Sequence, residues 1–408
     1  MVQREVLPNG VRIVTETVPG VESVSVGYWF DSGACDESDK TRGISHFIEH
    51  MLFKGTNSRS ARDIAREFDY IGGQVNAFTE KECTCYYAKV LAEHLPAAMD
   101  VLTDMLRFSR IDTKDIELEK NVILEEIKMH EDTPEDFVHD LFAEKIWSRH
   151  PLGYPIMGSA DIVQSLKRED LTDFIEKHYT PDRLVVAAAG NLNHKEFVER
   201  IADSFGSLKG TGCPRAYAEP EFNSESFFAK RSMEQVQFCI GARGFSNQDG
   251  NRYPLAIIDS ALGGGMSSRL FQEIRENRGL AYNIGSYSTS YSTGGFFTVY
   301  GGTSPDKFEE VLSLVKQEFA SLPRGSLTEE EMARAKNQIK GSLVLSQEGM
   351  GSRMIRIGRS ELFYGRVVTL EELISSILAV TADDVARVSG IIFDKEFYPT
   401  IAVGPERL

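Results

Sequence analysis

The stretch VESVSVGYWF, residues 21–30, places Val24, Val26 and Tyr28 on one face of a predicted strand, because side chains in a strand alternate between faces with a period of two. The stretch VQFCIG, residues 236–241, stands at the corresponding point of the second half of the chain. In each half a helix, two more strands and another helix are expected to follow in the same order. The sequence therefore indicates one structural unit that is used twice.

Later segments of the two halves also correspond. In each half, a long helix begins with a candidate N-cap residue followed by acidic residues, which the helix dipole favours at the N-terminal end. Each half also ends in an apolar strand. The paired segments are 96–108 with 305–319, 112–117 with 326–331, and 184–190 with 400–404. Strands mixed with amphipathic helices predict an α+β fold of two homologous domains, each an antiparallel-rich sheet packed with helices.

We expect these domains to span residues 1–210 and 211–408, since each then falls within the usual size range of a domain. Segment 208–220 contains glycine and proline and is the predicted linker. All eight histidines lie at or before His194, so the second domain cannot repeat a metal site built on histidine.

The net charge and the apolar segments of the chain limit its binding partners and its cellular compartment. With 45 basic and 61 acidic residues, the formal net charge is −16, which argues against nucleic acid or an anionic membrane as a partner. No stretch approaches the ~20 apolar residues of a membrane span, and residues 1–6 lack the apolar core of a signal peptide. We expect a cytoplasmic protein or, alternatively, the matured form of a mitochondrial matrix protein. The five cysteines are odd in number and scattered, which favours reduced thiols.

The stretch GISHFIEHMLFKG, residues 43–55, carries three groups that are costly to bury in an apolar segment. On a helix, His46 and His50 share one face and can offer two imidazole nitrogens to one ion at about 2.0–2.1 Å. Glu49 lies beside them, where it can reach water at the metal without being a ligand. Two histidines alone are more often hydrogen-bonded core residues, but the H-x-x-E-H spacing is the signature of inverzincin metallopeptidases.

A catalytic zinc site typically has a third protein ligand and keeps one position open for water. The best candidate lies on the predicted helix that contains Glu119 and Glu126, which are about two turns apart on one face. Val122, Ile123 and Ile127 predict that this helix is partly buried. Glu126 could bind the metal while Glu119 orients a ligand histidine, or both acids could belong to a solvated edge.

Taken together, His46, Glu49, His50 and the later Glu126 resemble the pitrilysin and insulin-degrading enzyme family, and most closely its short-chain branch that includes the mitochondrial processing peptidase. The resemblance spans nearly the whole chain. It implies that residues 1–210 form a zinc-binding catalytic domain. It further implies a Zn2+ cofactor held by His46, His50 and Glu126, with Glu49 as general base and Glu119 supporting a ligand histidine.

The same resemblance implies residues that bind substrate. The family's edge strand, which pairs with an extended peptide through backbone hydrogen bonds, corresponds to Asn76, Ala77, Phe78 and Thr79. Arg275 and Tyr282 correspond to a pair that grips the substrate carbonyl and helps to stabilise the oxyanion. Asp136 and Asp140 lie where acids read a substrate arginine. The plainer alternatives are an ordinary strand, a surface arginine with a core tyrosine, and a solvated acidic face.

Full-length members of the resembled family enclose a chamber with four related domains, whereas this chain has two. The resemblance therefore implies a homodimer in which Arg275 and Tyr282 serve the site of the other subunit. The expected function is a zinc-dependent endopeptidase that hydrolyses extended peptides or unstructured segments inside a dimeric chamber. The alternative is a non-catalytic scaffold subunit of the same fold, although such subunits commonly lack an intact ligand set.

Overall fold

The computed structural model describes residues 1–215, 217–325 and 327–405. Ala216 in the predicted linker and Ser326 at the predicted start of the second long helix lie outside the described residues. The chain forms two compact units. Unit 1 comprises Met1–Lys128, Tyr154–Ala216 and Ser346–Val368, and unit 2 comprises Met129–Gly153, Tyr217–Leu345 and Thr369–Leu408.

Unit 1 contains a six-stranded sheet in the order β1-β2-β6-β3-β5-β4. Only the β2 and β6 pair is parallel; the other neighbours run antiparallel. The strands are β1 (Val2–Val6), β2 (Arg12–Thr17), β3 (Ser23–Phe30), β4 (Gln74–Thr79), β5 (Thr84–Leu91) and β6 (Leu184–Gly190). The helices are α1 (Ile44–Leu52), α2 (Ala61–Tyr70), α3 (Leu95–Phe108), α4 (Thr113–Glu131), α6 (Ala160–Ser165), α7 (Arg168–His178), α8 (His194–Phe205) and α12 (Met350–Tyr364).

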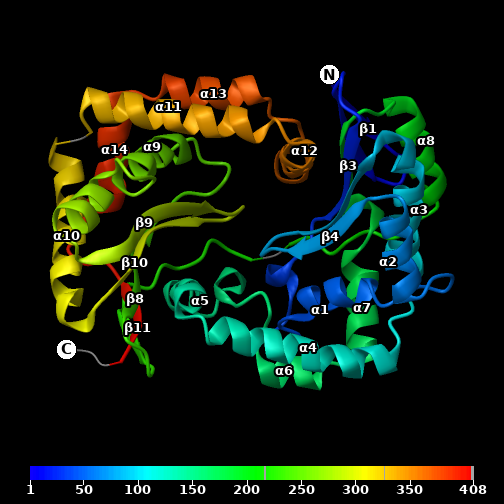
Figure 1. The fold of residues 1–408 in the computed structure, drawn as a ribbon, viewed down its shortest axis with the longest axis horizontal. Coiled ribbons are helices and arrows are strands. Elements are labelled where there is room, and N and C mark those ends of the chain that lie inside the picture. Colours follow the sequence, from blue (N-terminus) through cyan, green and yellow to red (C-terminus); the bar gives the residue numbers. More distant parts are fainter. Residues whose placement is uncertain (216, 326, 406–408) are drawn as a thin grey trace. The chain divides into compact units, whose positions relative to one another are not determined.

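Both faces of this sheet are buried, and β3 shows how. Val24, Val26 and Tyr28 belong to the main core, together with side chains of α1, α2, α3, α7 and α8, as the alternation in the sequence predicts. Figure 1 shows α2, α3 and α8 on this side of the sheet. Trp29 points to the other face, where it packs with Met354 and Ile357 of α12. The sheet therefore lies between two layers of helix.

Unit 2 contains a five-stranded sheet in the order β7-β11-β8-β10-β9, with β7 and β11 parallel and the other pairs antiparallel. This order and these directions match strands β2-β6-β3-β5-β4 of unit 1, so the predicted repeat and the α+β fold class are confirmed. The elements are β7 (Phe227–Lys230), β8 (Val236–Arg243), β9 (Ala281–Ser290), β10 (Gly295–Thr303), β11 (Thr400–Gly404), α5 (Pro134–Ile146), α9 (Arg252–Leu262), α10 (Phe308–Gly325), α11 (Glu329–Ser346), α13 (Leu370–Ala379) and α14 (Ala382–Phe393).

The division into units differs from a single cut at residue 210. Helix α5 from the first half packs against β8 and β11 of unit 2, and α12 from the second half packs against β2, β3 and β6 of unit 1. In each half the exchanged helix is the one that follows the long helix α4 or α11. The physical reason is that both faces of each sheet are apolar, and the alternation of side chains does not specify which helix covers the second face.

The predicted linker is fastened to unit 1 by the Gly212 N–H, which donates to the Asp182 carboxylate at 3.0 Å, and by Arg215. The Arg215 guanidinium donates to the Asp36 carboxylate at 2.9 Å and to the Glu82 carbonyl at 2.7 Å, and its side chain is largely buried. These ionic bonds hold the pKa of the Asp36 carboxyl below its usual value even though burial alone would raise it. The segment before Ala216 is thus anchored to unit 1.

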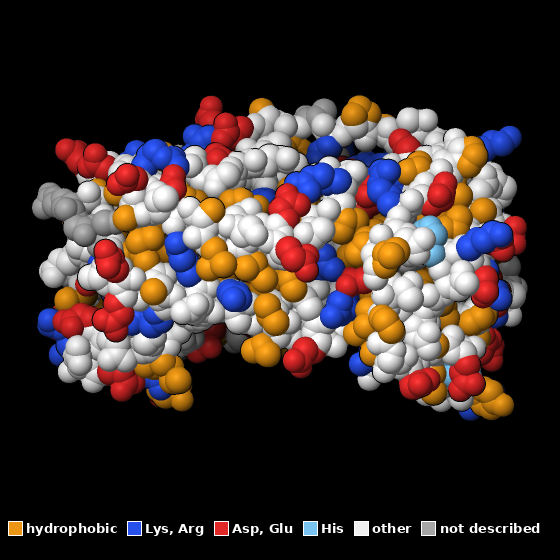
Figure 2. Space-filling model, turned by 90° about the horizontal axis from the view of Figure 1, so that it is seen from above, with side chains coloured by type: hydrophobic (Ala, Val, Ile, Leu, Met, Phe, Trp, Pro, Cys, Tyr) orange, Lys and Arg blue, Asp and Glu red, His pale blue; other side chains and the backbone are white. Residues whose placement is uncertain are grey.

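Three sequence-based expectations concern the surface and the thiols. All five cysteines are free thiols, and four of them are buried. Among the described residues, no helix combines the length and apolar character needed to cross a membrane. Acidic and basic side chains are interspersed over the face drawn in Figure 2.

Candidate active site

Helix α1 presents its polar side chains on one face because the opposite face is held in the core of unit 1. Ile44, Phe47 and Ile48 are fully buried, and at helical spacing this leaves His46, His50 and Glu49 together on the other side. The helix begins after Gly43, whose φ of 90° lies in the left-handed region. A Cβ at this position would meet the Met157 carbonyl oxygen at 2.4 Å, so only glycine fits.

The three predicted metal ligands come together in unit 1. The Glu126 Oε2 atom lies 3.7 Å from His46 Nε2 and 3.6 Å from His50 Nε2. Tetrahedral zinc with bonds near 2.1 Å requires ligand atoms about 3.4 Å apart, so a small adjustment accommodates the ion. Among the described residues, these three are the group of histidine, cysteine or acidic side chains close enough to hold a metal.

Helix α4 carries Glu126 and Glu119 to this site. Ile123 and Ile127 are buried in the core of unit 1 as predicted, and they fix the rotation of the helix. The expectation that Val122 contributes to the buried face is wrong, because its side chain is 50% exposed. The reason is that residues 122 and 123 are separated by about 100° around a helix, so only one of them lies fully on the core side.

Glu119 fixes the orientation of the second histidine. Its Oε1 atom lies 2.8 Å from His50 Nδ1, which makes Nδ1 the protonated nitrogen and leaves the Nε2 lone pair directed towards Glu126. Its Oε2 atom lies 2.5 Å from the Lys54 ammonium. Burial would raise the pKa of Glu119, but the hydrogen bonds from His50 and Lys54 outweigh it and lower this pKa. Lys54 was missed in the sequence; it lies two residues beyond the end of α1, outside the helical period that links His46, Glu49 and His50.

The two histidines have different electrostatic environments. Burial lowers the pKa of His46 to about 4, so its imidazole is neutral and able to bind a metal near neutral pH. Burial also opposes the charge on His50, but the hydrogen bond and the charge of Glu119 outweigh it and raise the pKa of His50. A bound cation would compete with the proton on the Nε2 atom of His50.

Glu49 is close to the ligands but does not belong to the ligand group. The Thr79 hydroxyl donates to Glu49 Oε2 at 2.6 Å, which fixes the carboxylate at the end of β4. Burial raises the pKa of Glu49 above its usual value, although this hydrogen bond opposes the rise. A raised pKa brings a carboxylate nearer to the range in which it both accepts and returns a proton.

A cavity of about 450 Å³ opens beside Glu49 and His50. Its walls are partly apolar, and the remaining lining residues are Phe53, Lys54, Ala61, Ile64, Ala65, Val75, Asn76 and Glu119. All of them belong to unit 1. The cavity therefore offers space for a side chain next to the candidate metal position.

Strand β4, which contains Asn76, Ala77, Phe78 and Thr79, is an edge strand, as the resemblance implies. It pairs with β5 and with no other strand of the described residues. Phe78 packs edge-on against Trp29 with ring centroids 5.4 Å apart, so its side chain supports the strand from the sheet face. The backbone on the outer side of β4 is left available for another strand.

In unit 2, Arg275 and Tyr282 lie against each other. Arg275 is in the π-helix Phe271–Asn277, and its guanidinium carbon lies 4.9 Å from the centre of the Tyr282 ring. The Tyr282 side chain is 79% exposed at the start of edge strand β9. Arg278 instead forms an ion pair with Glu273 at 2.7 Å. The predicted pair is thus adjacent and presented to solvent.

The two acids predicted to read arginine lie on α5, also in unit 2. Asp136 lines a cavity of about 420 Å³ together with Glu135, His139 and Tyr287, among others. The Asp140 carboxylate lies 3.6 Å from His130 Nε2 and does not line this cavity. The structure therefore assigns different surroundings to the two acids.

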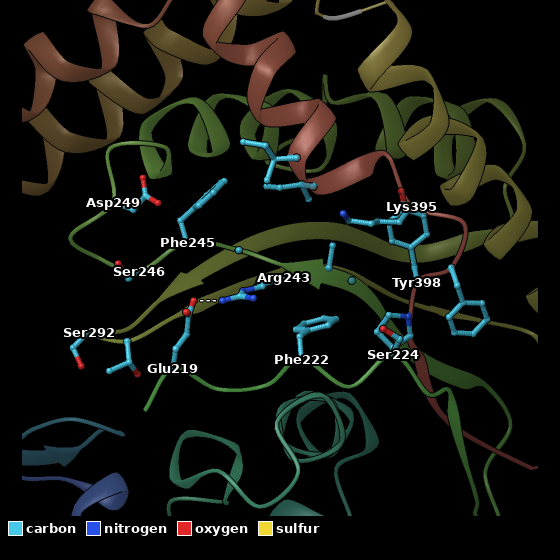
Figure 3. Close-up of a pocket in the computed structure, with 18 residues that line it drawn as sticks. Glu219, Phe222, Ser224, Arg243, Phe245, Ser246, Asp249, Ser292, Lys395 and Tyr398 are labelled. Atoms are coloured by element: carbon cyan, nitrogen blue, oxygen red, sulfur yellow. Dashed lines mark hydrogen bonds and ion pairs between the residues drawn. The ribbon is translucent and has the colours of Figure 1, made fainter. Parts of the chain in front are cut away.

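A larger cavity of about 690 Å³ in unit 2 contains none of the predicted site residues (Figure 3). Figure 3 shows Glu219 and Arg243 joined as an ion pair on one side, with the rings of Phe222, Phe245 and Tyr398 around the space. Its lining residues include no histidine or cysteine. It therefore lacks the donor set found on α1 and α4.

An inverted H-x-x-E-H helix completed by a glutamate from a second helix defines the inverzincin class of metallopeptidases. Family comparison agrees. Residues 12–160 match the family model described as insulinase (peptidase family M16), and residues 165–339 match the model described as the peptidase M16 inactive domain. The chain belongs to peptidase family M16.

Curated relatives cover the chain from end to end. An uncharacterized zinc protease of Bacillus subtilis, YmxG, is 43% identical over 397 residues, which is 97% of each chain. An uncharacterized zinc protease of Streptomyces coelicolor is 42% identical, covering 99% of this chain and 90% of the relative. The names of these relatives support Zn2+ as the cofactor of this chain.

Two solved structures share the fold. A peptidase M16 inactive domain from Pseudomonas fluorescens superposes with a TM-score of 0.93 at 18% identity, covering 100% of this chain and 98% of that one. A protease from Helicobacter pylori gives a TM-score of 0.92 at 20% identity, with 99% of both chains covered. At these identities the likeness establishes the fold alone.

Proposed function

We propose that this protein is a zinc-dependent endopeptidase that hydrolyses extended peptides or unstructured segments. The observation that carries the proposal is that His46, His50 and Glu126 converge while Glu49, a carboxylate with a raised pKa, lies beside them and does not belong to the ligand group. A structural zinc site is normally closed by four protein ligands, whereas three ligands and a nearby base are typical of a hydrolase. The alternative of a non-catalytic scaffold gives no reason for retaining Glu49.

In the proposed reaction, each role is assigned to particular side-chain atoms. His46 Nε2, His50 Nε2 and a Glu126 oxygen would hold the zinc, and Glu119 keeps His50 in the tautomer that this requires. When bound, zinc supplies Lewis-acid chemistry to the scissile carbonyl and to the attacking water. Glu49 accepts the proton of that water and returns it to the leaving amine. The Thr79 hydroxyl holds Glu49 Oε2 in place during both transfers.

Two features of unit 1 bear on the substrate. The open edge of β4 suits an extended peptide, which would add a strand through backbone hydrogen bonds. The cavity beside Glu49 has Phe53, Ile64 and Val75 in its lining, so it favours an apolar side chain next to the scissile bond. Folded proteins cannot present such a strand, which is why we propose unstructured substrates.

We further propose that the active form is a homodimer in which Arg275 and Tyr282 of one subunit support the oxyanion at the zinc site of the other. Their mutual contact and the exposure of Tyr282 support a role in contacting substrate. Sedimentation of the active protein should give the mass of a dimer. A fully active monomer would refute the proposal.

The function is tested by peptide-library cleavage with and without a chelator, using the wild-type protein and the Glu49→Gln variant. We expect cleavage sites with an apolar residue at one position next to the scissile bond, loss of cleavage on chelation, and recovery on adding Zn2+. Cleavage that persists after the zinc has been removed would contradict the proposal.

We propose a role in substrate selection for Asp136, which is exposed and lines a cavity with Glu135. Asp136→Asn is expected to lower kcat/KM for arginine-containing peptides by about two- to fivefold, the range of an exposed ion pair, and to leave neutral peptides unchanged. The matched control is Asp132→Asn, an exposed acid just before α5. Equal losses for both peptide classes would argue against recognition of arginine.

A further inference from the structure

Glu37 lies upstream of helix α1 and binds its first turn with both carboxylate oxygens. The Gly43 N–H donates to Oε2 at 2.7 Å, and the Ser45 N–H donates to Oε1 at 2.8 Å. Amides in the first turn of a helix have no acceptor within the helix, so each needs one from outside. Glu37 supplies acceptors to two of them.

The N-cap residue of α1 itself makes no side-chain cap hydrogen bond. A serine, threonine, aspartate or asparagine normally occupies the N-cap position, but here Gly43 occupies it and has no side chain to contribute. The Met157 carbonyl excludes every residue but glycine from this position. The cap must therefore come from another part of the chain, and a carboxylate also suits the positive end of the helix dipole.

The first turn matters because it contains His46. The His50 ring is oriented by Glu119, whereas the buried His46 Nδ1 atom has no hydrogen-bond partner among the described residues. The direction of the His46 ring therefore depends on where the backbone of this turn lies. The amide that Glu37 holds through Oε1 belongs to Ser45, the residue directly before His46.

We infer that Glu37 is a positioning residue for the zinc site: by capping α1 from upstream, it fixes the backbone that aims His46 Nε2 at the metal. This inference rests on the proposed metal site and adds a residue that touches neither metal nor substrate. Burial raises the pKa of Glu37 to about 8, while the Ser45 and Gly43 amides favour its ionised form. The metal affinities of the wild type and its variants are accordingly best compared above pH 8, where the Glu37 carboxylate is ionised.

The test replaces Glu37 with Gln and measures binding of Co2+ to the metal-free, full-length protein. A glutamine offers one acceptor oxygen, and its NH2 group faces the second amide without being able to accept from it. We expect Co2+ affinity to fall by about 10- to 100-fold, the usual effect of losing a residue that orients a metal ligand. We also expect the visible absorption of bound Co2+ to change, because this absorption reports coordination geometry.

The matched control is Asp170→Asn, the same acid-to-amide change in the capping box of α7. Asp170 Oδ2 accepts the Lys167 N–H at 2.8 Å, and this helix of unit 1 carries no metal ligand. The control should lower Tm to a similar extent and leave Co2+ affinity and spectrum unchanged. Glu37→Asp, which keeps the charge but is too short to reach both amides, should weaken Co2+ binding in the same direction as Glu37→Gln.

The outcomes separate the two proposals. Wild-type protein that binds no stoichiometric Co2+ would overturn the proposed metal site and this inference with it. Wild-type binding together with unchanged affinity and spectrum in Glu37→Gln would overturn only the role of Glu37. Equal weakening in Asp170→Asn would also overturn it, because the effect would then follow general loss of stability.

Discussion

The Glu49→Gln variant is expected to retain zinc at one ion per chain and to lose peptide hydrolysis. Glutamine has nearly the same shape, and Glu49 lies outside the group of His46, His50 and Glu126, so metal binding should persist. An amide cannot take a proton from water at neutral pH. Removal of a general base typically lowers kcat by about 10²–10⁴-fold, and we expect a loss in this range.

The control for Glu49→Gln is Glu125→Gln, which makes the same change beside a metal ligand. Glu125 is exposed and pairs with Lys128 on the outer side of α4, so its substitution should alter neither zinc content nor kcat. Metal analysis and single-turnover cleavage of one peptide measure both quantities. Substantial turnover by the zinc-loaded Glu49→Gln variant would refute the assignment of the base.

The His46→Ala variant is expected to lose zinc on dialysis and to lose activity with it. Removing one of three protein ligands leaves His50 and Glu126, which together are too few for a catalytic zinc site. The folded protein should also lose its stabilisation by metal. For the wild type, free zinc at a thousandfold excess over Kd raises the free energy of unfolding by about 4 kcal/mol, whereas the variant should show almost no increase.

Thermal unfolding with added zinc or chelator, together with metal analysis, measures this effect. His94→Ala is the matched histidine control, because His94 lies in unit 1 in a short helix before α3 and outside the metal cluster. It should keep both zinc and the zinc-dependent rise in Tm. A His46→Ala protein that keeps stoichiometric zinc would contradict the proposed ligand set.

Much of this site could be predicted because its key spacings are local. His46, Glu49 and His50 share a helical face by the period of the α-helix, and Glu119 and Glu126 share another for the same reason. The alternation that places Val24, Val26 and Tyr28 on one face of β3 is equally local. Val122 was misassigned because a one-residue difference in helix rotation depends on the packing of α4 against the core.

Other contacts could not be predicted from spacing. Thr79 reaches Glu49 from a strand that begins 22 residues after α1 ends, and Lys54, just beyond the end of α1, contacts Glu119 of α4. Glu37 binds α1 through backbone amides, which carry no signal in the amino-acid sequence. Spacing also does not reveal that α5 of the first half belongs to unit 2 and that α12 of the second half belongs to unit 1, because many apolar helices could cover a given sheet face.

The sequence by itself determined the repeated α+β unit and the polar face of α1, because both follow from periodicities of 2.0 and 3.6 residues that side-chain chemistry reveals directly. Only the tertiary structure decided that Glu126 meets the two histidines, that Thr79 holds Glu49, and that Glu37 caps the helix. These contacts join segments distant in the chain. Their distances depend on how apolar faces pack together, and such packing is a property of the whole core rather than of any one stretch.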